Sequence, residues 1–139
     1  NWKWVSSAVV QPLDLGDPTV GTDVTICVFD QTGRRLSATA PAGGTCSGKP
    51  CWNPSSTGYK YKSRDLTPQG LQAIALKPGP AGKAKVKVKG KGSNLVMPML
   101  GLTTPARVQL RRGDAPACWE AVFDTPTTNT GSVFRGKSN

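Results

Sequence analysis

Glycine and proline interrupt this chain so often that a mainly helical fold is disfavoured. Sixteen glycines and twelve prolines are scattered over the 139 residues. Between them no apolar pattern with a period of 3.6 residues runs long enough for a stable helix, whereas short alternating apolar segments recur. The sequence therefore predicts an all-β protein, an antiparallel β-sandwich of about eight short strands.

The expected strands are short alternating runs bounded by turn residues. Three pairs of them flank typical hairpin loops, QTGR, PGPAG and GDAP. The run VTICVFD carries apolar residues on both faces, which favours a central strand. The strand candidates are residues 2–10, 24–30, 35–40, 59–62, 71–77, 83–90, 106–112 and 117–123.

We expect a single β-sandwich domain over residues 1–123, followed by a C-terminal tail, residues 124–139, with a short strand at 132–135. One hydrophobic core suffices for a chain of this length. No apolar run approaches the length of a transmembrane segment. The chain begins at Asn1 without methionine, as expected of a matured secreted protein or an excised fragment.

Four cysteines in a chain without histidine indicate disulfides. Cys46 and Cys51 bracket a short loop, while Cys27 and Cys118 lie in strand-like runs, so we predict the pairs Cys46–Cys51 and Cys27–Cys118. Four cysteines allow three connectivities, and spacing alone does not choose among them. A zinc site is the rival interpretation, but the usual CxxC pairs are missing. Oxidised cysteines place the chain outside a reducing cytosol, in an extracellular or periplasmic space.

The lack of histidine also removes the commonest general base and most triads. The single glutamate, Glu120, lies in a strand pattern and is more typical of a solvent-facing residue than of a glycosidase carboxylate. We therefore expect no enzyme and no cofactor. Three aspartates in the segment 14–23, Asp14, Asp17 and Asp23, are compatible with calcium, but turn chemistry explains them better.

Two features suggest binding. Trp52, Tyr59 and Tyr61 follow the cysteine loop and are candidates for an aromatic platform that stacks on sugar rings, although the same rings could simply cover the core. Alternate lysines follow in GKAKVKVKGKG, where a regular strand would place them all on one face. These lysines are Lys83, Lys85, Lys87, Lys89 and Lys91.

The lysine face has two interpretations. It is the pattern of a strand with one buried and one solvated face, and lysine rows also discourage edge aggregation. It is alternatively a polyanion site, which Lys60, Lys62 and Lys77 would broaden if their strands are adjacent. The net charge of +10 attracts polyanions without specifying one. No interleaved aromatic supports nucleic acid, and we expect no sequence-specific nucleic-acid binding.

The chain contains, in this order, CVFDQTG, GGTCSGKPCW, GYKYK, GKAKVKVKGKGSNL, the segment Pro105 to Leu110 and ACWEAVF. Together these motifs resemble a family of secreted bacterial disulfide-bonded β-rich domains of unknown function, common in environmental and predatory-type proteobacteria. The resemblance covers residues 15 to 123, and the closing VFRGKSN is similar as well. It implies an exported domain and carries over no catalytic residue.

Two hypotheses for function follow. In the first, the protein is a non-catalytic structural or assembly module of a surface or fibre, in which residues 2–10 or 132–135 pair with another copy or another surface protein by strand addition. In the second, it is a carbohydrate- or polyanion-binding module whose partner is an acidic polysaccharide, held by the aromatic loop and the lysine face.

Overall fold

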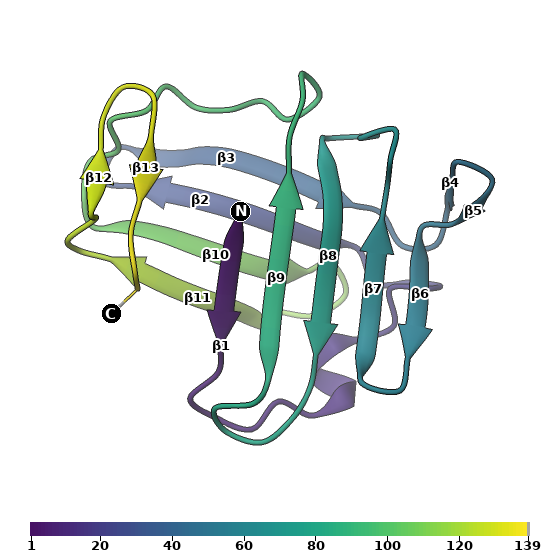
Figure 1. The fold of residues 1–139 in the computed structure, drawn as a ribbon. Coiled ribbons are helices and arrows are strands. Elements are labelled where there is room, and N and C mark those ends of the chain that lie inside the picture. The colour runs from purple at the N-terminus through teal and green to yellow at the C-terminus, as the bar shows by residue number, and fades with distance from the viewer. Residues whose placement is uncertain (139) are drawn as a thin grey trace.

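The protein is built from two antiparallel β-sheets packed face to face, and the expected all-β fold is confirmed (Figure 1). The computed structural model describes residues 1–138. Sheet I has the strand order β1 (Trp2–Val5), β9 (Lys85–Gly90), β8 (Leu71–Lys77), β7 (Gly58–Lys62) and β6 (Trp52–Ser55). Sheet II has the order β11 (Cys118–Phe123), β10 (Ala106–Arg112), β2 (Val24–Asp30) and β3 (Gly33–Ala40).

Several smaller elements lie outside the two sheets. A single 3₁₀ turn, η1, spans Pro12–Leu15. The cysteine loop carries the short ladder of β4 (Thr45–Cys46) with β5 (Lys49–Pro50). Near the C-terminus, β12 (Thr128–Asn129) pairs with β13 (Phe134–Arg135).

The three hairpins expected from turn chemistry are present. β2 pairs with β3, β8 with β9, and β10 with β11, all antiparallel. β2 is an inner strand, flanked by β10 and β3, as its two apolar faces predicted. The N-terminal strand is shorter than expected, since β1 ends at Val5 and Val10 contributes only an isolated bridge to Gly79.

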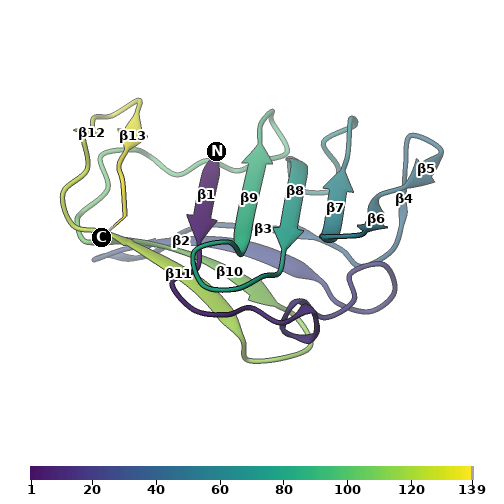
Figure 2. The same cartoon turned by 60° about the horizontal axis from the view of Figure 1, so that its bottom comes forward.

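The core lies between the two sheets and takes alternate side chains from each strand. From sheet I it receives Ile74, Leu76, Val86 and Val88, and from sheet II it receives Leu110 among others. Burying one such aliphatic side chain stabilises the fold by about 1.5–3 kcal/mol. The strands of sheet I run across those of sheet II (Figure 2), so the two sheets do not cover each other completely.

The C-terminal segment packs on the domain through its small hairpin. The Asn129 side chain accepts from the Leu102 backbone N–H at 2.9 Å and donates to the Leu102 carbonyl at 2.6 Å. Phe134 meets Phe123 edge to face, with ring centroids 6.1 Å apart. The short strand expected near the C-terminus is therefore present at Phe134–Arg135. The Phe134 ring packs against the edge of the core.

Only one of the two predicted disulfides is present. Cys46 and Cys51 are bonded, whereas Cys27 and Cys118 are free, so the predicted Cys27–Cys118 pair is wrong. Cys27 pairs across the sheet with Gln109, and Cys118 pairs with Arg111, which places β10 between them. Strands two places apart are separated by about 9.5 Å, beyond the ~4.4–6.8 Å that a disulfide spans between Cα atoms.

Candidate functional site

The outer face of sheet I is rich in lysine because its strands alternate. On β9 the side chains of Val86 and Val88 are buried, so Lys85, Lys87 and Lys89 take the outer face. The predicted stripe is thus confirmed for these three lysines. The other two predicted members lie outside the strand, Lys83 in the turn before β9 and Lys91 after its last residue, and both are exposed.

Neighbouring strands extend the charged face around a strip of small residues. Ala75 on β8 pairs with Lys87 on one side and with Lys60 of β7 on the other. Lys3 of β1 pairs with Lys87 and continues this row. One step along the strands, a second row places Ala73 between Lys89 and Lys62.

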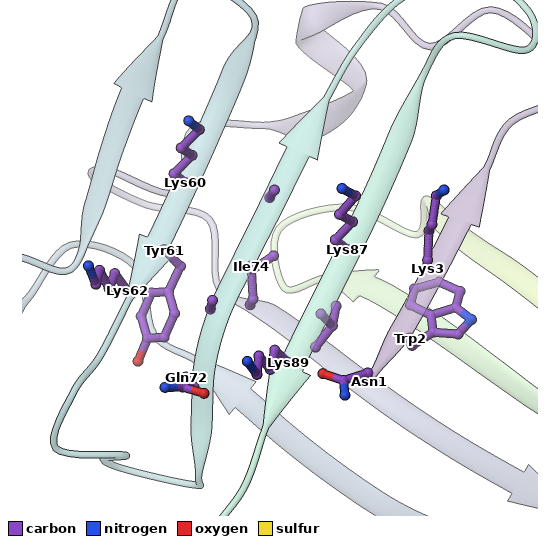
Figure 3. Close-up of a pocket in the computed structure, with 13 residues that line it drawn as sticks. Asn1, Trp2, Lys3, Lys60, Tyr61, Lys62, Gln72, Ile74, Lys87 and Lys89 are labelled. Atoms are coloured by element: carbon purple, nitrogen blue, oxygen red, sulfur yellow. The ribbon is translucent and has the colours of Figure 1, made fainter. Parts of the chain in front are cut away.

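These rows enclose a groove of 620 Å³, called here the lysine groove. Ala73 and Ala75 of β8 form its floor, between the paired strands β7 and β9. Its walls are lysines from β1, β7 and β9 (Figure 3). β7 and β9 are about 9.5 Å apart on either side of β8, which leaves an open channel above the short alanine side chains. The five lysines that line it are Lys3, Lys60, Lys62, Lys87 and Lys89.

No opposite charge balances the lysine groove within the sheet. The five strands of sheet I contain neither aspartate nor glutamate. The ion pairs Arg35–Asp30 and Arg112–Asp114 do not involve a lysine. Lysines two residues apart on one strand are about 6.5–7 Å apart, inside the ~8 Å Debye length at physiological salt. Their mutual repulsion is relieved when an anion binds between them.

The aromatic residues of the predicted platform face the core instead. Trp52 and Tyr61 are each 2% exposed and pack with ring centroids 5.1 Å apart. The Trp52 Nε1–H donates to the Pro41 carbonyl, and the Tyr61 hydroxyl donates to the backbone carbonyl of Thr67. Burial raises the pKa of Tyr61. Tyr59 is half-buried, so these rings form no exposed stacking surface.

The aspartates of residues 14–23 act as hydrogen-bond acceptors for loop backbone. Asp14 accepts from the Gln11 N–H, Asp17 from Thr19, and Asp23 from the Ala42 N–H. Among residues 1–138 no group of three or more acidic or cysteine side chains could hold a metal ion. The contacts of these three carboxylates are those of ordinary turn formers.

The outer face of sheet II places Glu120 beside Gln109, whose Nε2 donates to Glu120 Oε2 at 2.5 Å. Arg107 and Arg111 share this face and are exposed. This face also carries an excess of positive charge, from two arginines against one glutamate. It therefore serves as a natural reference surface for the lysine groove.

Sequence reasoning missed Lys3 and the alanine floor. The alternation of WKWV contained the signal for Lys3, because it sets the lysine opposite the two tryptophans. That β1 pairs with β9 could not be derived from local pattern. Ala73 and Ala75 gave no signal of their own, since small residues in a strand are usually unremarkable.

The chain was compared with protein-family models, with curated proteins and with solved structures, and none of them matches it. In residues 1–138 no helix is long and apolar enough to cross a membrane.

Proposed function

We propose that the protein is a non-catalytic extracellular module that binds a linear acidic polysaccharide in the lysine groove. One observation carries the proposal: lysines of β7 and β9 face each other across an alanine floor on a sheet without acidic residues. The order of the strands makes this a continuous positive channel rather than scattered surface charge.

The dimensions of the groove favour a linear chain with repeated anionic groups. Along each wall the lysines recur about every 6.5–7 Å, and the walls are about 9.5 Å apart. A chain lying along β8 would place successive carboxylates or sulfates within reach of Lys60 and Lys87, then of Lys62 and Lys89. A single small anion would engage only part of this array.

Other ligands are less well supported. Neutral sugars are usually held by exposed rings, and Trp52 and Tyr61 are buried. Single-stranded nucleic acid needs stacking platforms beside its positive groove. The two rings in the groove lining are Trp2, which is half-buried, and Tyr61, which is buried. The Cys46–Cys51 disulfide supports an oxidising compartment, in which acidic polysaccharides of cell surfaces are found.

The test is elution from immobilised heparin, repeated with polygalacturonate as the carboxylate ligand. The variant Lys60→Glu/Lys87→Glu changes the net charge by four units within the groove. Its matched control, Arg107→Glu/Arg111→Glu, makes the same change on the outer face of sheet II. We expect the groove variant to elute at clearly lower salt than the control. Equal shifts would mean that net charge alone retains the protein, and the proposal would fail.

Self-assembly by strand addition is the second candidate, because β1 and β11 are edge strands of their sheets. The Trp4 Nε1–H of β1 already donates to the Glu120 carbonyl of β11. Two observations place it second. Residues 2–5, on which it depends, pair with β9 of their own domain, and residues 134–135 pair with β12. Sedimentation at moderate salt distinguishes the candidates, because an assembly module gives large species that grow with protein concentration.

A further inference from the structure

The inner face of sheet II is not fully covered by sheet I. Along β2 the inward side chains of Val24 and Ile26 are buried, but Val28 is only half-buried. On β3, Ala38 and Ala40 are buried, whereas Leu36 is half-buried. Burial thus falls toward the end where sheet II extends past β1 to the β12–β13 hairpin (Figure 1).

A cavity of 710 Å³ lies at this end, between the two sheets. Its walls come from β1, from Leu71, Val88 and Gly90 of β8 and β9, from the inner face of sheet II, from the loop 91–105 and from residues 134–138. Most lining side chains are aliphatic or aromatic, including Val28, Leu36, Leu100 and Phe134. The volume falls in the range of about 300–1,000 Å³ that is typical of sites for small organic ligands.

The charged residues of the lining all have one sign. They are Lys3, Arg135 and Lys137, and no acidic side chain contributes to the walls. The loop beside the cavity also exposes apolar side chains, with Val96 80% and Met99 85% exposed. The apolar lining suits a hydrocarbon chain. The charged side chains of the lining are all cationic and suit an anionic end group.

We propose that this cavity binds a single-chain anionic amphiphile of the fatty-acid class. The hydrocarbon chain lies between the sheets against Val28, Leu36 and Phe134, and the carboxylate lies beside Arg135 and Lys137. Burying each methylene between the sheets removes apolar surface from water and therefore favours binding of the hydrocarbon chain. The cavity does not include the alanine floor of the lysine groove. The two linings share Asn1, Trp2, Lys3 and Val88, of which Lys3 is the one lysine, so variants elsewhere in each lining are needed to separate them.

Tryptophan fluorescence reports on occupation, because Trp2 lines the cavity whereas Trp52 does not. The probe is dibromostearate below its micelle-forming concentration, whose bromine atoms quench an indole in contact with them. We expect saturable quenching in the wild type, most of which disappears in Trp2→Phe and persists in Trp52→Phe. Absence of saturable quenching, or equal loss in both variants, would overturn the proposal.

Two kinds of variant locate the ligand. Arg135→Glu/Lys137→Glu should weaken stearate binding about tenfold or more by repelling the carboxylate. Val28→Phe should block the cavity, and Leu100→Phe serves the same purpose from the loop if the first variant folds poorly. Unchanged binding in a folded cavity-blocking variant would contradict the assignment. So would dimer formation with no stearate binding, which would indicate a strand of a second copy in the cavity.

The cavity and the lysine groove are tested separately by charge-matched variants. Lys60→Glu/Lys87→Glu should lose retention on heparin and keep dibromostearate binding. Arg135→Glu/Lys137→Glu should show the reverse. If the groove variant lost stearate binding as strongly as the cavity variant, the fatty acid would be binding to surface charge, and the cavity proposal alone would fail.

Discussion

Lys60 and Lys87 face each other across Ala75, because β8 carries this small residue between the two strands that carry the lysines. Neither lysine has an acidic partner on sheet I. The pair is held by backbone pairing of three adjacent strands, so its spacing does not depend on flexible loops. This rigidity distinguishes the groove from an accidental collection of surface lysines.

Replacing Ala75 tests whether the floor of the groove is in contact with the ligand. Ala75→Glu places a carboxylate between Lys60 and Lys87 and should weaken polysaccharide binding about tenfold or more through charge repulsion of the ligand. Ala75→Gln adds the same bulk without the charge and should have a smaller effect. Calorimetric titration with a heparin oligosaccharide measures both. Equal losses would indicate that bulk rather than charge is responsible.

The sequence was sufficient to predict the local parts of the fold. Turn residues between alternating runs predicted the β2–β3, β8–β9 and β10–β11 hairpins, since strands joined by short loops pair with each other. The same alternation placed Lys85, Lys87 and Lys89 on one face. These features depend only on residues near one another in the chain.

Pairing between distant strands was not predictable in this way. β1 joins β9 and β10 joins β2 because of packing across the core, which no local pattern encodes. The lysine groove depends on the order of β9, β8 and β7, so only its β9 wall could be foreseen. The error on Cys27 and Cys118 has the same origin, since the insertion of β10 between their strands is a long-range property.

The two free cysteines predict a defined thiol count. Cys118 is exposed, whereas Cys27 is 3% exposed and packs beside Ser37. Ellman's reagent should therefore modify one thiol rapidly in the native protein and a second only after unfolding without reductant. Cys118→Ser should abolish the rapid phase. A protein that shows no thiol when unfolded without reductant would have its second disulfide after all.

Gly58 and Gly33 form a matched pair for testing a close backbone approach. Each begins the second strand of a hairpin, with φ of +126° and +125°. A Cβ at Gly58 would lie 1.8 Å from the Leu76 carbonyl oxygen, whereas at Gly33 nothing lies within 4 Å. Gly33→Ala should cost about 1–3 kcal/mol of backbone strain. Gly58→Ala should cost at least ~1 kcal/mol more, because the steric clash is added.

Urea unfolding of both glycine variants measures the difference. The slope of the unfolding free energy against urea concentration should be the same in both variants and in the wild type. The urea concentration at the midpoint of unfolding then reports stability directly. Equal destabilisation would show that β7 and β8 are not held as close at Gly58 as the structure places them. Gly58 and Lys60 both belong to β7, which forms one wall of the groove. Gly58→Ala should therefore also shift Lys60 from its place in that wall.

The lowered pKa of Asp114 predicts how the free energy of unfolding changes at acid pH. Hydrogen bonds from Arg112 and then from Thr22 lower the pKa of Asp114 from 3.8 to about 2. Arg112 Nε and Nη2 donate to its two oxygens at 2.9 and 3.0 Å, and Arg112 Nη1 also donates to the Leu13 and Asp14 carbonyls. The carboxylate therefore orients the arginine that ties the η1 turn to the end of β10.

A pKa that is lower in the folded state gives stability that is present above the unfolded pKa and lost as pH falls. For Asp114 the window runs from about pH 4 down to about 2. Asp114→Asn should be less stable than the wild type at pH 7, and the difference should shrink through this window. Thermal unfolding of both proteins at a series of pH values measures it, and the double difference removes the contributions of other carboxylates. A difference that stays constant down to pH 2 would mean that the Arg112–Asp114 pair does not stabilise the folded state through its charge.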